Sequence, residues 1–173
     1  FVYIYDRYDI WKIDPSGVRV PVCITQAYGR RNNIRLRYMK LDPEQEYIPS
    51  DQPSLLSAFN ETTMQSGFYK ASFNVVSGPQ LLVLDNYHYG TVKKAKDASR
   101  LIFTKENVTD FPDLWYGDAD FSECQQISNA NPQQCNFTWP TVQLEEWISS
   151  SGEKLKGLLY IPENIDTTKK YPL

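Results

Sequence analysis

The chain has 173 residues, a formal net charge of −3, 14% aromatic residues and 12 tyrosines. This length can bury a core and fits one domain with an appendage. Its basic residues form only short clusters, Gly29-Arg30-Arg31 and Lys93-Lys94-Ala95-Lys96, so the sequence lacks the electrostatic pattern of nucleic-acid binding. No apolar run approaches the roughly 18 residues of a membrane-spanning helix.

The beginning of the chain predicts three successive strands, which we expect over Phe1–Asp6, Asp9–Asp14 and Val18–Thr25. The last two flank a tight turn at Asp14-Pro15-Ser16-Gly17, because proline presets φ at the first central position and glycine tolerates a positive φ. Strands joined by minimal turns are typical of an antiparallel unit. The chain begins inside the first expected strand, which indicates a piece of a larger protein.

The middle of the chain predicts further strands separated by turns. Residues 34–41 alternate with a period of two, after a polar connector at 28–33 and before a loop at 42–53. Further strands are expected at Ser54–Asn60 and Gly67–Phe73, at Pro79–Asn86 (buried) with Ala98–Thr104 as its neighbour, and at Pro112–Asp118. Lys93–Ala98 resembles a turn, and Asp118–Pro140 is loop-rich. The second half repeats the first in outline, with Ser54–Asn60 in the place of Asp113–Asp118 and a period of about 50 to 70 residues.

The end of the chain predicts a β-hairpin, with strands at Thr141–Ser150 and Lys154–Pro162 joined at Ser151-Gly152. The fold class is therefore all-β, with about two antiparallel units of three or four strands and a C-terminal hairpin. Residues in apolar stretches of the expected strands should be mostly buried. These are Trp11, Phe59, Phe103 and Leu114.

The three cysteines, Cys23, Cys124 and Cys135, lack the paired short gaps of a zinc site. Cys124 and Cys135 could form a disulfide if the loop between them folds back. The alternative is three small, mostly buried side chains.

No segment of the sequence predicts a catalytic, cofactor or metal site. No glycine pair brackets a serine as in the G-x-S-x-G elbow of serine hydrolases, and the only histidine, His88, is expected in a loop or on the surface. The carboxylates and Ser122 of Asp118-Ala-Asp120-Phe-Ser122-Glu123 alternate as in calcium loops, but the required glycine is missing, which favours a plain turn.

Three other features have simple interpretations. Adjacent Glu145 and Glu146 point to opposite faces of a strand and cannot act as an acid–base pair. Arg30 and Arg31 could steer an acidic group, although a solvated pair is the simpler interpretation. Three sequons are attributed to chance, at Asn60, Asn107 and Asn136.

An ordered set of short stretches resembles one protein family. These stretches are Tyr8–Asp14 with Gly17 and Thr25, Gly29-Arg30, Arg37-Tyr38, Leu41-Asp42, Ala58–Asn60, Gly67–Tyr69, Lys94–Ala98, Phe111–Leu114, Ile127-Ser128, Asn131–Gln134, Trp147, Gly152, Leu155–Pro162 and Lys169–Pro172. In this order they resemble bacterial members of the prolyl oligopeptidase family of serine peptidases, in the branch similar to dipeptidyl peptidase IV.

The resemblance implies a partial β-propeller of antiparallel blades over residues 1–140. Residues 141–173 would then hold the first strands of an α/β-hydrolase domain that is otherwise absent, entered through Gln143–Ser150 and Lys154–Ile161. The Ser-Asp-His triad of the parent enzyme would lie downstream. A periplasmic or extracellular location, a peptide substrate and no cofactor are implied as well.

Two functions follow as hypotheses. In the first, the chain is a non-catalytic part of a serine peptidase that gates and orients peptide substrates. In the second, it is a standalone β-rich binding or adhesion module that uses exposed tryptophan and tyrosine. The terminal Lys169–Leu173 favours the first, because it resembles the approach to a buried hydrolase strand. Open strand edges in a propeller sector also predict self-association.

Overall fold

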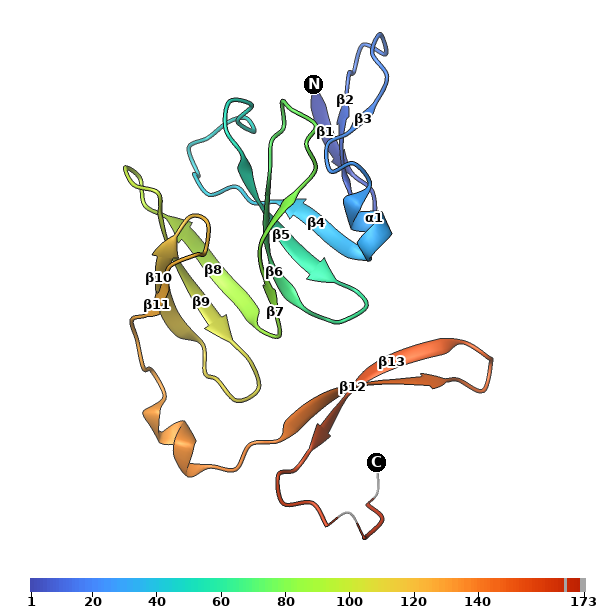
Figure 1. Ribbon diagram of the computed structural model, residues 1–173, viewed down its shortest axis with the longest axis vertical. Coiled ribbons are helices and arrows are strands. Elements are labelled where there is room, and N and C mark those ends of the chain that lie inside the picture. The colour runs from blue at the N-terminus through green and yellow to red at the C-terminus, as the bar shows by residue number, and fades with distance from the viewer. Residues whose placement is uncertain (167, 172–173) are drawn as a thin grey trace.

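Antiparallel strands make up nearly all the regular structure of this computed structural model, which describes residues 1–166 and 168–171 (Figure 1). Strands account for 43% of the chain and helices for 6%, so the all-β prediction is confirmed. Four separate antiparallel sheets follow one another along the chain, without a closed barrel, as in a partial propeller-like fold. None of the described helices is long and apolar enough to cross a membrane.

The first sheet has three strands in chain order, namely β1 (Val2–Tyr5), β2 (Ile10–Ile13) and β3 (Val22–Cys23). The predicted turn is present, since the Gly17 N–H donates to the Asp14 carbonyl at 3.0 Å and Gly17 has a φ of +74°. The third strand is much shorter than expected. Val18 and Val20 are strongly exposed in the loop that precedes it, because only Val22 and Cys23 pair with β2.

The second sheet is a four-stranded meander that follows a short helix. Its parts are α1 (Tyr28–Asn32), β4 (Ile34–Tyr38), β5 (Ser54–Asn60), β6 (Ser66–Ala71) and β7 (Gln80–Asp85). The predicted alternation in β4 is confirmed, because Ile34 and Leu36 are buried while Arg35 is exposed. Residues 28–33 were expected to be a connector without helix, and α1 corrects that prediction.

The strand at β7 is not buried as predicted. It lies at the edge of its sheet and pairs only with β6, so its apolar run is covered on one side and Leu81 is half-exposed. A continuous apolar run does not distinguish a central strand from an edge strand.

The third sheet is a second four-stranded meander, formed by β8 (His88–Lys94), β9 (Arg100–Glu106), β10 (Asp113–Asp118) and β11 (Cys124–Gln126). Lys93 and Lys94 belong to edge strand β8 and not to a turn. The predicted pairing of Ala98–Thr104 with the preceding apolar strand is wrong, because β9 lies between β8 and β10. Once β8 is counted, β5 and β9 are each the second strand of their meander. The sequence had instead matched β5 with β10, one strand later.

The chain ends in the predicted hairpin, after the 3₁₀ helix η1 (Pro132–Asn136). Its strands are β12 (Thr141–Ile148) and β13 (Lys154–Ile161), and they form a two-stranded sheet of their own. Gly152 has a φ of +84° in the connecting turn. Pro172 and Leu173, part of the expected approach to a hydrolase strand, lie outside the described residues.

A cluster of buried apolar residues joins the first sheet to the second. Its buried members are Ile10, Ile24, Ile34, Leu36, Leu56, Ala58, Tyr69, Ala71 and Phe73. Of the four residues predicted to be core, only Phe103 is fully buried. Trp11, Phe59 and Leu114 are half-buried. In β2 the core position is Ile10, and its neighbour Trp11 faces the other way because successive strand residues alternate between faces.

An aromatic cluster joins the second sheet to the third. Phe121, in the turn between β10 and β11, stacks on Phe68 of β6 with ring centroids 4.5 Å apart. It also contacts Phe103 at 5.2 Å, within the third sheet. Beside this contact, the Lys70 ammonium lies 2.9 Å from the Asp120 carboxylate. One turn therefore carries both an apolar and an ionic contact between the meanders.

Replacing Phe121 by alanine should lower the free energy of unfolding by about 2–3 kcal/mol, because the ring packs against both meanders. Urea denaturation followed by circular dichroism would measure the change. Phe137→Ala is the matched control, since Phe137 is 65% exposed and should cost less than about 0.5 kcal/mol. Equal losses in the two variants would show that Phe121 does not couple the sheets.

Candidate functional site

The only histidine is a surface residue, as expected. His88 lies at the start of edge strand β8, and its side chain is 70% exposed. Its Nε2 atom is 3.9 Å from the Glu106 carboxylate across the strand pair, beyond hydrogen-bond distance. This geometry provides no polarised nucleophile beside the imidazole.

The acidic stretch after β10 forms a turn, as the sequence favoured. The Asp118 carboxylate accepts hydrogen bonds from the Ser122 N–H at 2.8 Å, the Ser122 hydroxyl at 2.5 Å and the Glu123 N–H at 3.1 Å. The hydroxyl bond from Ser122 is the main cause that lowers the pKa of Asp118. Among the described residues, no three histidine, cysteine or acidic side chains converge as metal ligands would.

The structure decides between the two alternatives left open for the cysteines against the disulfide, and it also differs from the expectation that they are mostly buried. All three thiols are free, so Cys124 and Cys135 do not form a disulfide, and both are exposed rather than buried. The reason is local, because Cys124 pairs with Gly117 in the sheet while Cys135 belongs to η1. The Cys135 thiol donates to the Pro132 carbonyl within that helix at 3.1 Å.

Both arginines are exposed, as the solvated interpretation expects, and each also makes a local contact. Arg30 contacts the Asp6 carboxylate at 2.8 Å, and Arg31 donates to the Gln26 carbonyl at 2.8 Å. Both guanidinium groups therefore support local structure.

The adjacent glutamates of β12 behave as predicted. Glu145 lies opposite Gly157, and Glu146 lies opposite Lys156, one position further along the ladder. The Glu146 carboxylate contacts Lys154 and Lys156 at 2.5 and 2.9 Å, on the face that Glu145 does not share.

Two of the three sequons are explained by turn geometry. The Asn60 side-chain oxygen accepts the N–H groups of Thr62 and Thr63, and Asn107 does the same for Thr109 and Asp110. An asparagine followed two residues later by threonine is thus a turn signal at these positions.

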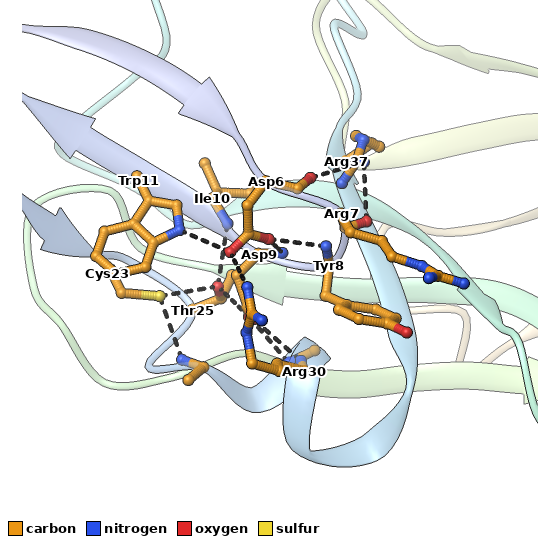
Figure 2. A network of polar contacts seen from close by, with 12 residues as sticks. Asp6, Arg7, Tyr8, Asp9, Ile10, Trp11, Cys23, Thr25, Arg30 and Arg37 are labelled. Carbon is orange, nitrogen blue, oxygen red and sulfur yellow. Dashed lines mark hydrogen bonds and ion pairs between the residues drawn. The ribbon is translucent and has the colours of Figure 1, made fainter.

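A network of polar contacts joins the first sheet, α1 and β4 (Figure 2). At its centre is the buried carboxylate of Asp9, only 1% exposed. It accepts hydrogen bonds from the Thr25 hydroxyl at 2.7 Å and from the N–H groups of Gly29 and Arg30 at 2.9 and 3.0 Å. A helix N-terminus presents unsatisfied N–H groups, and the residue before α1 is Ala27, which has no side-chain acceptor. Asp9 therefore caps α1 from a distant part of the chain.

Gly29 is required at this contact. A Cβ atom at position 29 would lie 2.5 Å from the Ile34 carbonyl oxygen and 2.9 Å from that of Tyr8. The helix therefore approaches β4 and the Asp6–Asp9 turn more closely than any larger residue permits.

The second carboxylate of the network, Asp6, forms the turn between β1 and β2. It accepts the N–H groups of Asp9 and Tyr8 at 2.6 and 2.8 Å. The Arg30 guanidinium at 2.8 Å and the Trp11 indole at 3.1 Å complete its contacts. Burial opposes ionisation, but these hydrogen bonds outweigh it and lower the pKa of Asp6 to about 2.

The network is structural, because it ties the turn between β1 and β2 to α1 and β4. The Thr25 hydroxyl and the Asp9 carboxylate at its centre are 0% and 1% exposed, so a substrate would not reach this pair. The roles of Asp6 and Asp9 were not predicted from the sequence. The sequence did contain a signal for Asp6. It lies between two expected strands, two and three residues before the N–H groups of Tyr8 and Asp9 that it accepts.

Comparison with known proteins adds no identification. No protein-family model matches the chain, and no curated protein matches it.

Replacing Asp9 by alanine should lower the free energy of unfolding by about 2–4 kcal/mol, because two backbone N–H groups and the Thr25 hydroxyl lose their acceptor in a buried site. Chemical denaturation would measure this. Asp97→Ala, at an exposed position, is the control and should change stability by less than about 0.5 kcal/mol. A loss below about 1 kcal/mol for Asp9→Ala would mean that α1 does not depend on this cap.

Asp6 should make stability depend on acid pH. Its pKa is lowered from 3.8 to about 2 on folding, so its contribution is complete above about pH 4 and is lost as the pH falls toward 2. Between pH 5 and pH 2 the unmodified chain should lose about 1–2 kcal/mol more than Asp6→Asn, after allowance for partial exposure. Urea titrations across this range, with Asp97→Asn as control, would test it. Parallel pH curves for the unmodified chain and Asp6→Asn would contradict the assignment.

Proposed function

We propose that this chain is the non-catalytic propeller part of a serine peptidase similar to dipeptidyl peptidase IV, of the prolyl oligopeptidase family. One observation carries the proposal: two four-stranded antiparallel meanders follow each other directly along the chain. A β-propeller is built from such sheets repeated around a central channel. The ordered sequence resemblance supports the same interpretation.

The connection between the meanders supports this proposal. Only Asn86 and Tyr87 separate the last strand of one meander from the first strand of the next. The meanders then pack through Phe68 of β6 and Phe121 of the turn between β10 and β11. The three-stranded sheet before them extends the series, and its core is shared with the second sheet.

In this proposal the chain positions the substrate, and another domain of the parent enzyme carries the catalytic residues. Blades around a narrow channel restrict access to short or extended peptides and orient them. Hydrolysis is performed by a Ser-Asp-His domain to which β12 and β13 lead. The parent is a bacterial protein of the periplasm or the extracellular space. The alternative is a standalone binding module, for which the strongly exposed aromatic side chain of Tyr47 is the supporting observation.

The chain alone should hydrolyse no peptide, because the described residues include no histidine beside a nucleophile. Incubation with a proline-containing dipeptide nitroanilide should give only the background rate. A rate above background that disappears in Ser151→Ala or His88→Ala would contradict the proposal.

Reading the gene beyond the codon for Leu173 tests the identity of the parent. An apolar strand should follow within a few residues, then a G-x-S-x-G elbow about a hundred residues later, then an aspartate and a histidine in that order. A stop codon directly after Leu173 would favour the binding module instead.

A further inference from the structure

A pocket of about 520 Å³ lies in the third sheet, where the ends of β9 and β10 meet β11 and η1. This volume is in the range of small-molecule sites. Four aromatic side chains from separate segments line it, namely Tyr87, Phe111, Trp115 and Trp139. Phe111 and Trp139 are 44% and 38% exposed, so part of this aromatic surface is open to a ligand.

The charges around the pocket exclude an ionic ligand. The Lys105 ammonium lies 4.0 Å from the centroid of the Tyr87 ring and 5.4 Å from that of Trp115. It also contacts the Asp85 carboxylate at 3.2 Å. The position that an aromatic cage would offer to a cation is therefore already filled. An anion would meet Asp110 and Asp113, which also line the pocket.

The remaining lining matches a ligand rich in hydroxyl groups. Four amide side chains contribute to it, those of Gln126, Asn129, Asn131 and Gln134. An amide both donates and accepts hydrogen bonds, as a hydroxyl does. The Asp110 carboxylate, which accepts the Tyr87 hydroxyl at 2.8 Å, adds a charged acceptor at the exposed edge.

The pocket wall is fixed by hydrogen bonds within the chain. Asp113, only 8% exposed, accepts the Ser128 hydroxyl at 2.6 Å, the Ala130 N–H at 2.8 Å and the Gln126 amide at 2.9 Å. On the other side, the Trp139 indole donates to the Gln134 carbonyl at 3.0 Å, and the Gln134 amide donates to the Thr109 carbonyl. A wall held in this way loses little entropy when a ligand binds.

We propose that this pocket binds a neutral saccharide of one or two pyranose units. The apolar face of a sugar ring packs against the exposed aromatic surface of Trp139 and Phe111, and its hydroxyl groups bond to the Asn129 amide and to Asp110. This site is independent of the peptidase proposal, since its lining comes from the third sheet, the connector before it and the segment that follows it.

Isothermal titration calorimetry of the whole chain with maltose, cellobiose, lactose and N,N′-diacetylchitobiose would test the site. At least one disaccharide should bind, and Trp139→Ala should weaken that binding about tenfold or more. Asn129→Ala, in an exposed loop, should weaken it about threefold to tenfold. The matched control is Trp147→Ala, because Trp147 is 49% exposed on β12 and does not line the pocket. It should leave the affinity unchanged.

Three results would overturn the proposal. The first is no binding of any of these disaccharides up to about 10 mM, about ten times a Kd of 1 mM. The second is an equal loss of binding in Trp139→Ala and Trp147→Ala. The third is binding of a neutral proline-rich hexapeptide at the pocket with no disaccharide binding. Each result leaves the proposed peptidase parent standing, because that proposal is tested by the downstream gene sequence.

Discussion

The structure depends on the packing of Phe121 between two sheets. A single antiparallel sheet with apolar residues on both faces needs a neighbour to cover it. Phe121 of the third sheet supplies this by stacking on Phe68 of the second, and the left-handed backbone of Phe121, with a φ of +57°, directs the turn toward that contact. Lys70 and Asp120 lie beside it as an ion pair. The same Phe68 ring also contacts Tyr89 of β8 at 5.1 Å, and Lys105 of β9 pairs with Asp85 of β7 at 3.2 Å, so further contacts between the meanders surround the Phe121 stack.

The first sheet is attached in a different way, through a polar cap above a shared apolar core. Ile10 and Ile24 bury their side chains against the second sheet, while Asp9 beside them binds the N-terminus of α1. Because Asp9 is buried and fully hydrogen-bonded, it specifies one arrangement of the helix rather than adding much net stability. The apolar core provides the free energy of packing, and the Asp9 carboxylate fixes the position of Gly29 in α1.

Local sequence patterns were sufficient to predict the elements that depend on interactions between neighbouring residues. The alternation at Ile34–Tyr38 and the Ser151-Gly152 turn each depend on a few adjacent residues, and both are found. The sequence could not predict α1, because its capping group is about twenty residues away and its own cap position is an alanine. It also missed β8, because Lys93 and Lys94 lie on an edge strand, where lysine is tolerated.

The same distinction explains why function is harder to predict here than fold. The strands follow from periodic patterns, but the pocket beside β10 is assembled from residues between positions 87 and 139 that share no spacing. Trp115 comes from a strand, Trp139 from the segment after η1, and Lys105 from the neighbouring strand. Asp113 joins them, since its buried carboxylate fixes the Gln126–Ala130 loop against the sheet. A rigid sheet that holds irregular loops in one geometry is the arrangement in which binding sites arise, and in this chain the third sheet provides it.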